Sequence, residues 1–237
     1  MIPWLHPIQL EFPPVELALA DPDGLLAAGG DLRPERILNA YRQGIFPWYN
    51  PGEPILWWSP DPRCVLHPQD LHISRSLRKK LRKMDYRVTF DQAFDDVIQA
   101  CAEPRSYSAG TWISPDMMAA YSRLHWLGHG HSVEVWQGDT LVGGLYGLAL
   151  GRVFFGESMF SRRTDASKIA FVYLVEHLEK WGYALVDCQV YNDHLASLGA
   201  SEVPRRRFVA ELEELVSQTL YHSWQVTPLY QRESEAE

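Results

Sequence analysis

The clearest hydrophobic pattern falls in the second half of the chain, where three segments rich in β-branched and aromatic residues alternate with polar positions. They are 131–136, 140–150 and 153–160. Short turns at Gly138 and Gly151 separate them, and such turns join antiparallel neighbours. The pattern predicts a β-meander, followed by an amphipathic helix from about residue 165 to a stop at Gly182.

The stretch after this helix, residues 183–190, again has the pattern of a strand. A helix between two strands usually carries the chain back across the sheet, so this strand should lie parallel to a neighbour. Side chains two apart in a strand share a face. Asp187 and Gln189 should therefore point one way and Cys188 the other.

Asn192 is a suitable N-cap for a short helix that ends at Gly199. A carboxylate and an amide thus project from a strand end just before a helix N-terminus, which suggests a place for chemistry. A structural alternative stays open, because polar residues at strand ends commonly satisfy loop backbone groups.

The first sixty residues are rich in proline, glycine and tryptophan, which favours turns over long regular elements. One helix is predicted, with Pro34 at its first position and Gly44 after its end. Three tryptophans follow in turn-rich sequence: Trp48, Trp57 and Trp58. Such tryptophans usually fill the core of a small domain; the functional alternative is an aromatic platform on which a base stacks.

The remaining segments predict three more helices and one more strand. The helices are 90–102, 115–127 and 204–220, and the strand is 223–228. Ser114, followed by a proline, is the expected cap of the second helix. His125, His129 and His131 near its end have a spacing that could hold zinc, but no nearby acid or cysteine completes a set. A helix cap is favoured, and no metal is expected.

One further helix is predicted to be strongly basic. Residues 75–87 carry seven basic residues and one acid, although the whole chain has a net charge of −8. Leu77, Leu81 and Met84 are spaced to face the core. The other face would present Arg75, Arg78, Lys79, Arg82 and Lys83. Like charges this close destabilise a helix unless an anion compensates, so a phosphate-binding face is favoured over a solvated one.

Composition narrows the class of protein. A chain of 237 residues with 46% apolar and 22% charged residues is globular, with one large domain or two small ones. No apolar run approaches the roughly 20 residues that span a bilayer, and the N-terminus lacks the features of a secretory signal. Three widely spaced cysteines fit a reducing compartment. We therefore expect a cytoplasmic protein without a membrane partner, and a monomer by default.

The order of meander, helix, strand and Asn-capped helix resembles the GNAT (GCN5-related N-acyltransferase) fold. Residues 192–199 are a near match to the motif that follows a strand in that family. Members that use acyl-CoA hold its pyrophosphate with a glycine-containing loop. The corresponding residues here, 161–167, contain no glycine, so this resemblance does not imply acyl-CoA as the donor.

A more specific resemblance covers nearly the whole chain. Its blocks are GGDL (29–32), YRQGIFPWY (41–49), PILWWSPDPR (54–63), HISRS (72–76), GTWI (110–113), LHWLGHGHSVEVW (124–136), GESMFSR (156–162), DCQV (187–190) and NDHLASLGA (192–200). Together they resemble the leucyl/phenylalanyl-tRNA–protein transferase family. That family moves leucine or phenylalanine from a charged tRNA to the N-terminal amine of proteins beginning with Arg or Lys, which then enter N-degron degradation. An ester on a tRNA as donor accounts for the missing glycine loop.

The resemblance implies an α+β fold with a small N-terminal domain, residues 1–63, and a GNAT-like acyltransferase domain, residues 64–237, whose mixed sheet is flanked by helices. It implies no cofactor and places the reacting centre at Asp187, Gln189 and Glu157. The residues it implies for the adenosine and the aminoacyl group are Tyr41, Trp48, Trp112, Tyr121, Leu145, Phe154, Phe171, Leu174 and Val186. The tRNA stem is expected on the basic helix face described above.

These residues suggest a mechanism for ester aminolysis. An α-amine has a pKa near ~7.7–8, so part of it is neutral at cytosolic pH and positioning matters more than a strong base. We expect Asp187 to orient Gln189, whose carbonyl oxygen accepts a hydrogen bond from the attacking amine. Glu157 is the expected site for the cationic side chain of the acceptor; its structural alternative is an ordinary buried ion pair.

Three other functions account for parts of the sequence. An acyl-CoA acetyltransferase is disfavoured by the missing glycine loop. A Fem-type aminoacyl-tRNA ligase shares fold and donor but usually carries a duplicated GNAT-like unit, for which this chain is too short. A non-catalytic RNA-binding protein would explain the basic helix but would leave Asp187, Gln189 and Glu157 without a role.

Overall fold

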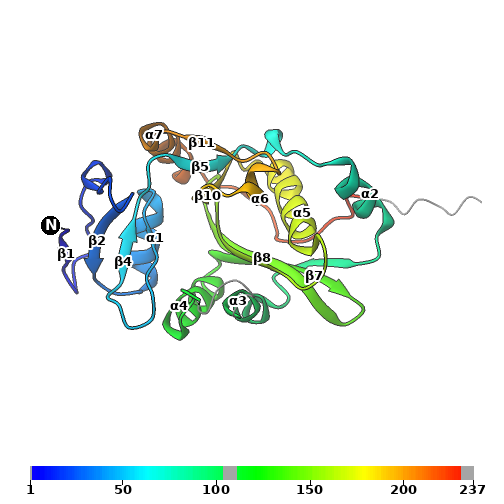
Figure 1. Cartoon of the computed structure of the whole chain (residues 1–237), viewed down its shortest axis with the longest axis horizontal. Coiled ribbons are helices and arrows are strands. Elements are labelled where there is room, and N and C mark those ends of the chain that lie inside the picture. Colours follow the sequence, from blue (N-terminus) through cyan, green and yellow to red (C-terminus); the bar gives the residue numbers. More distant parts are fainter. Residues whose placement is uncertain (1, 104–110, 231–237) are drawn as a thin grey trace, which may run out of the picture.

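The computed structural model describes residues 2–103 and 111–230. It contains a small sheet formed by N-terminal residues and a large mixed sheet flanked by helices on both faces (Figure 1). This confirms the predicted α+β class, with a small N-terminal domain ahead of a larger one. The position of the boundary, after residue 63, stays a prediction.

The small sheet has the strand order β1-β2-β4-β3. Its strands are β1 (Trp4–Leu5), β2 (Leu25–Gly29), β3 (Phe46–Pro47) and β4 (Leu56–Trp58). Helix α1 (Pro34–Arg42) packs against β3, begins at a proline and is followed by Gly44 with a positive φ of 73°, as the sequence predicts. Trp57 is fully buried here and fills the core, whereas Trp48 is 47% exposed.

The large sheet has the strand order β11-β5-β10-β9-β8-β7-β6. Its strands are β5 (Arg63–Leu66), β6 (Arg87–Phe90), β7 (Gly130–Gln137), β8 (Thr140–Leu150), β9 (Val153–Ser161), β10 (Leu185–Gln189) and β11 (Ser201–Val203). Strands β7, β8 and β9 form the predicted antiparallel meander. Helix α5 (Ala166–Trp181) then crosses back, so that β10 lies parallel to β9, as predicted.

Helices cover both faces of the large sheet. They are α2 (Arg75–Lys83), α3 (Phe94–Ala102), α4 (Pro115–Trp126), α5, the short α6 (Asp193–Ala196) and α7 (Arg205–Val216), with 3₁₀ turns at Val15–Leu17 and Pro68–Asp70. Ser114 and Asn192 cap α4 and α6 as predicted, each accepting a backbone N–H from three residues ahead.

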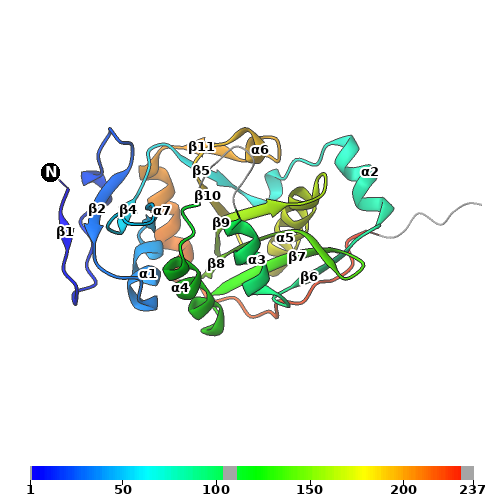
Figure 2. The ribbon, with the colours of Figure 1, turned by 60° about the horizontal axis from the view of Figure 1, so that its bottom comes forward.

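Two hydrophobic clusters lie on opposite faces of the sheet. One contains buried residues of α1, α3, α4 and α7; the other contains those of α2 and α5. In Figure 2, α3 and α4 lie in front of the sheet and α5 behind it. Along β10 the faces alternate, because Val186 and Cys188 belong to the α5 cluster while Asp187 points away from it to Arg63.

The predicted closing strand at 223–228 is wrong. Residues 221–230 form no strand but cross the α5 cluster as an extended segment, which we call the C-terminal strap. Trp224 stacks on His131 with ring centroids 3.7 Å apart, and the Thr227 N–H donates to His177 Nε2 at 2.8 Å. The alternating apolar positions that suggested a strand pack against side chains of the α5 cluster. The backbone hydrogen bond that a neighbouring strand would accept is accepted by a histidine instead.

Candidate active site

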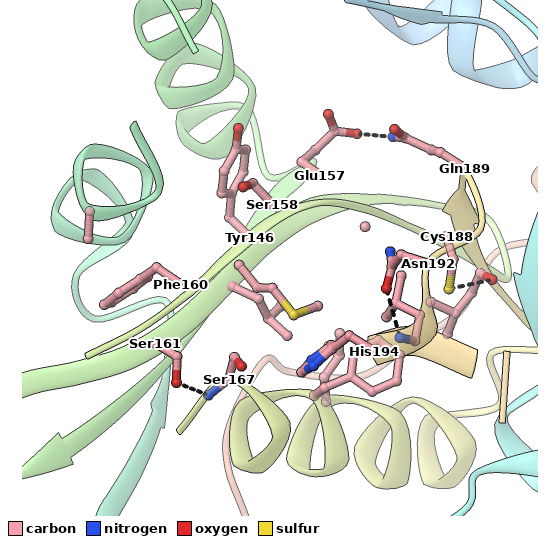
Figure 3. Close-up of a pocket in the computed structure, with 18 of the residues that line it drawn as sticks. Tyr146, Glu157, Ser158, Phe160, Ser161, Ser167, Cys188, Gln189, Asn192 and His194 are labelled. Carbon is pink, nitrogen blue, oxygen red and sulfur yellow. Dashed lines mark hydrogen bonds between the residues drawn. The ribbon is translucent and has the colours of Figure 1, made fainter. Parts of the chain in front are cut away.

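A cavity opens where β9 and β10 part. The two strands pair in parallel from Val153 opposite Leu185 to Phe155 opposite Asp187, and no further. Beyond that point the separated strands line a cavity of about 810 Å³ together with residues of α5 and α6 (Figure 3). Its size is that of a site for a small molecule or the end of a larger one.

Both predicted reacting residues on its rim lie at irregularities of the sheet. On β9, Tyr146 faces Ser158 and Gly147 faces Gly156, which leaves Glu157 as an extra residue. On β10, the register with β5 shifts between Asp187 and Gln189. Bulges redirect side chains and are common beside active sites. Here they turn two polar side chains toward each other across the gap.

Glu157 is held by a network of hydroxyl groups. Tyr41, from α1, donates to Glu157 Oε1 at 2.6 Å, and the Tyr121 hydroxyl, from α4, lies 2.6 Å from that of Tyr41. Burial raises the pKa of both tyrosines, which keeps them protonated as donors. Burial also raises the pKa of Glu157 to about 7, against the opposing effect of hydrogen bonds from Tyr41 and Tyr121. Glu157 can therefore change its charge near neutral pH.

Gln189 has a strained backbone and an oriented side chain. Its φ is +63°, which costs a non-glycine residue about 1–3 kcal/mol, and its N–H donates to Asp187 Oδ1 at 2.9 Å. Its side-chain Nε2 donates to Glu157 Oε1 at 3.1 Å (Figure 3). Glu157 Oε1 accepts from Tyr41 and, when the carboxyl group is ionised, can only accept, so the amide presents its NH₂ end to it. No donor among residues 2–103 and 111–230 is recorded for the amide's carbonyl oxygen Oε1, which can therefore accept from a substrate.

Asp187 lies behind the cavity wall rather than on it. Its side chain is fully buried and forms a bidentate ion pair with Arg63, Nε–Oδ1 2.8 Å and Nη2–Oδ2 2.7 Å. Asp187 accepts the backbone N–H of Gln189, whereas Glu157 accepts a hydrogen bond from the side chain of Gln189. No role for Arg63 is predicted from the sequence. Its available signal was a single arginine at the start of the otherwise apolar strand β5.

The predicted apolar residues come together on the α5 side of the cavity. All of them line it: Leu145, Phe154, Phe171, Leu174 and Val186. Each is buried within the α5 cluster. This wall, which we call the apolar wall, can accept an apolar side chain, because it offers area to bury and no charge.

The predicted aromatic residues divide into three groups. Trp112 lines the cavity. Tyr41 and Tyr121 are fully buried, with their hydroxyl groups at Glu157, so in this structure their rings offer no free face for a base. Trp48 lies elsewhere, edge-on to Trp58 at 5.5 Å beside a separate small hollow. The Trp58 Nε1–H donates to the Trp48 carbonyl at 2.6 Å and helps to fix it there.

The basic helix is α2, capped by Ser74. Leu77 and Leu81 are buried, but Met84 does not continue the helix: it ends it in a left-handed conformation with φ +48°. The residues predicted to meet tRNA are all exposed: Arg75, Arg78, Lys79, Arg82 and Lys83. Lys80 is tied to the chain before α5, donating to the Thr164 carbonyl at 2.5 Å.

Two of the three histidines considered for zinc, His125 and His131, have other partners. His125 Nδ1 lies 2.8 Å from the Gly130 carbonyl, and His131 Nδ1 lies 2.8 Å from Asp91 Oδ2. Within residues 2–103 and 111–230, no group of three or more His, Cys, Asp or Glu is placed to bind a metal ion. In the same part of the chain, no helix is long and apolar enough to cross a membrane.

Comparison with known proteins relates this chain to a family. Residues 65–213 match the family described as leucyl/phenylalanyl-tRNA protein transferase, and residues 30–61 match its N-terminal domain. A leucyl/phenylalanyl-tRNA–protein transferase of Stutzerimonas stutzeri (strain A1501) is 65% identical over 212 residues, which cover 90% of this chain and 94% of that protein. One of Cellvibrio japonicus (strain Ueda107) is 61% identical over 218 residues, 92% of this chain and 93% of the other.

Solved structures give a weaker likeness. A "GCN5-related N-acetyltransferase from Kribbella flavida" aligns with a TM-score of 0.37 and 13% identity, over 73% of this chain and 61% of that one. A likeness at this level carries no argument. The relationship rests on the family match and on relatives that share about two thirds of their residues with this chain along most of its length. The chain belongs to the leucyl/phenylalanyl-tRNA–protein transferase family and is an aminoacyltransferase.

Proposed function

We propose that this enzyme transfers leucine or phenylalanine from aminoacyl-tRNA to the N-terminal α-amine of proteins that begin with Arg or Lys, and so marks them for N-degron degradation. Methionine is a further candidate donor. The observation that carries the proposal is the pair Glu157 and Gln189, hydrogen-bonded across the gap between β9 and β10 beside an apolar cavity. One cavity thus combines an acidic group, a side-chain carbonyl oxygen that takes no donor from the described part of the chain, and room for an apolar side chain.

The donor's side chain would lie against the apolar wall. A leucine or phenylalanine side chain gains about 1.5–3 kcal/mol on full burial, while a charged side chain would lose its hydration without finding a partner. The ester carbonyl would then lie toward Gln189, with the terminal adenosine near Trp112, whose ring can stack on a base.

The acceptor amine would be held by Gln189. Its carbonyl oxygen accepts a hydrogen bond from the amine as nitrogen attacks the ester carbon. The C–N bond forms, the C–O bond to the ribose breaks, and a proton from the amine ends on the ribose oxygen. Asp187 supports this step indirectly, through the backbone N–H of Gln189. The role is one of positioning and charge stabilisation.

Glu157 would select the acceptor. An arginine or lysine side chain brings a permanent positive charge, and an ionised carboxylate at the rim of the cavity is its natural partner. The pKa of Glu157 is raised to about 7. Binding of the cationic side chain should lower this pKa, because a nearby positive charge favours the ionised carboxylate. An acceptor that begins with Ala offers no such charge.

The tRNA stem would lie along the exposed face of α2. Five exposed basic side chains on one short helix of an acidic protein match a phosphate backbone, which fixes position without reading sequence. The proposal includes a cytoplasmic monomer that needs no cofactor, with its domain boundary after residue 63.

Transfer of radiolabelled phenylalanine tests the proposal. Phe-tRNA is incubated with the enzyme and a protein beginning with Arg, and in parallel with the same protein beginning with Ala. Label is expected on the Arg form alone. Equal labelling of both would remove the acceptor assignment, and salt-sensitive tRNA binding without any transfer would remove the catalytic one.

A further inference from the structure

The side chain of Arg63 makes contacts that its position at the start of β5 does not require. Its guanidinium is fully buried and makes three hydrogen bonds, two to the Asp187 carboxylate and one, from Nη1, to the Gly44 carbonyl at 3.0 Å. The rings of Phe46 and Phe208 lie 4.9 and 4.6 Å from its centre. The group is thus enclosed and all its contacts are directional.

Each hydrogen-bond partner of Arg63 is connected to one of the two residues at the rim of the cavity. Asp187 accepts the backbone N–H of Gln189 and so supports its left-handed conformation. Gly44 follows α1, the helix from which Tyr41 donates to Glu157. Arg63 therefore joins the strand end that carries Gln189 to the helix that holds Glu157. The strand, β10, belongs to the large sheet, and the helix, α1, packs against the small one.

We propose that Arg63 is a positioning residue of the transfer reaction, whose guanidinium sets the distance and orientation between Glu157 and Gln189. This proposal rests on the function proposed above and goes beyond it. Arginine suits the task because its planar fork binds both carboxylate oxygens and still has a donor for a third group. The three donors of lysine radiate from one nitrogen and do not match this planar arrangement.

A second buried arginine provides a matched control. Arg36, on α1, is also fully buried; its Nε lies 3.2 Å from Asp31 Oδ1 and its Nη2 donates to the His6 carbonyl at 2.9 Å. None of these partners contacts Glu157 or Gln189. Replacing Arg36 by lysine disturbs a buried arginine of the same protein while leaving the connection between Gly44 and Asp187 intact.

The test compares Arg63→Lys with Arg36→Lys in Phe-tRNA transfer to an Arg-initiated protein. Both variants are expected to lower Tm. Arg63→Lys should lower kcat about 10²-fold, because small displacements at a reacting centre have effects of that size. The KM for Phe-tRNA should stay within a few fold of wild type, and Arg36→Lys should keep its kcat. Added guanidinium, but not ammonium, should restore part of the kcat of Arg63→Ala.

A kcat for Arg63→Lys equal to that of Arg36→Lys would overturn the proposal and leave Arg63 a structural residue. If Arg63→Ala does not fold, the double variant Arg63→Lys/Asp187→Asn serves instead: losses in kcat that do not add are expected, and additive losses contradict the proposal. Hydrogen exchange of the Gln189 N–H gives a readout without transfer. The exchange rate should increase in Arg63→Lys and stay unchanged in Arg36→Lys. If the wild-type enzyme itself transfers no phenylalanine, that result counts only against the proposed function.

Discussion

The two sides of the cavity differ in what fixes them. The polar side consists of Glu157 and Gln189, supported from behind by Tyr41, Asp187 and Arg63, and its geometry depends on directional bonds of 2.6–3.1 Å. The apolar wall, on the α5 side of the cavity, consists of side chains that contact one another without such constraints. Hydrogen-bonded networks lose function when one member leaves, whereas packed walls lose it by degrees. We therefore expect rate to depend on the polar side and choice of donor on the apolar wall.

The largest effect is expected at Gln189. Gln189→Ala removes the oxygen that would accept the amine, and kcat should fall by about 10²-fold or more, as when one preorganised hydrogen-bonding group is removed. The affinity for Phe-tRNA should change far less. Steady-state transfer and filter binding measure the two quantities. Gln225→Ala, an exposed amide on the C-terminal strap, is the control, and an unchanged kcat in Gln189→Ala would exclude the proposed role.

A smaller loss is expected at Glu157. Glu157→Gln keeps the shape of the side chain but removes its charge, and kcat/KM for an Arg-initiated acceptor should fall about 10–100-fold, the range for losing a hydrogen bond to a charged group. Measured against pH, wild-type kcat/KM should rise through about 7 as Glu157 ionises. The variant should keep only the later rise due to the acceptor amine. A rise near pH 7 in the variant would assign it to another group.

The same carboxyl should also affect stability. Its pKa in the folded protein is about 7, above the ordinary 4.5, so the folded state holds this proton more tightly than the unfolded chain. Its contribution to the free energy of unfolding should be complete below about pH 4.5 and lost as pH rises to about 7. Denaturant unfolding of Glu157→Gln should lack this slope, and a slope identical to wild type would contradict the assignment.

On the apolar wall we expect an effect on donor binding. Leu174→Ala removes part of the surface against which the donor side chain would lie, and the KM for Phe-tRNA should rise about tenfold, as expected from the apolar area lost. The kcat should change little. Leu178→Ala, one turn along α5 and buried in the same cluster, should lower stability without raising KM. Equal KM values for the two variants would place the donor elsewhere.

The smallest effect concerns α2. Arg78→Ala should weaken tRNA binding a few fold and reduce the slope of log affinity against log salt by about 0.9, the value for one phosphate contact on a duplex. Arg123→Ala, an exposed arginine on α4, is the control. Titrations at several salt concentrations give both slopes, and a slope for Arg78→Ala equal to that of the control would move the tRNA away from this helix.

Most of the fold could be predicted because its signals are local. These signals are caps such as Asn192, terminal glycines such as Gly182 and the alternation along the meander. Each determines the conformation of residues only a few positions away in the sequence. The C-terminal strap shows the limit of such signals. Trp224 and Val226 alternate as in a strand, but the partner of the neighbouring Thr227 N–H is His177, 50 positions away in the sequence, and not a strand.

The site was less predictable because its geometry depends on contacts between residues far apart in the sequence. The residues of the centre could be named, but the bulge that exposes Glu157 depends on the register between β8 and β9, and the contact of Arg63 with Asp187 joins residues 124 positions apart. Trp48 was expected beside the adenosine because of its block in the family pattern. Its position against Trp58 is set by packing within the small domain, which the sequence does not display.

The hydrogen bond from Tyr41 to Glu157 has a consequence for engineering. The carboxylate belongs to the large sheet, yet one of its donors comes from a helix of the small domain. A designer who transplanted the large domain alone would take an acidic group without one of its hydroxyl partners, although every residue that lines the cavity would be present. New acceptor preferences are therefore better sought by varying α1 and β9 together, as a single unit of selection.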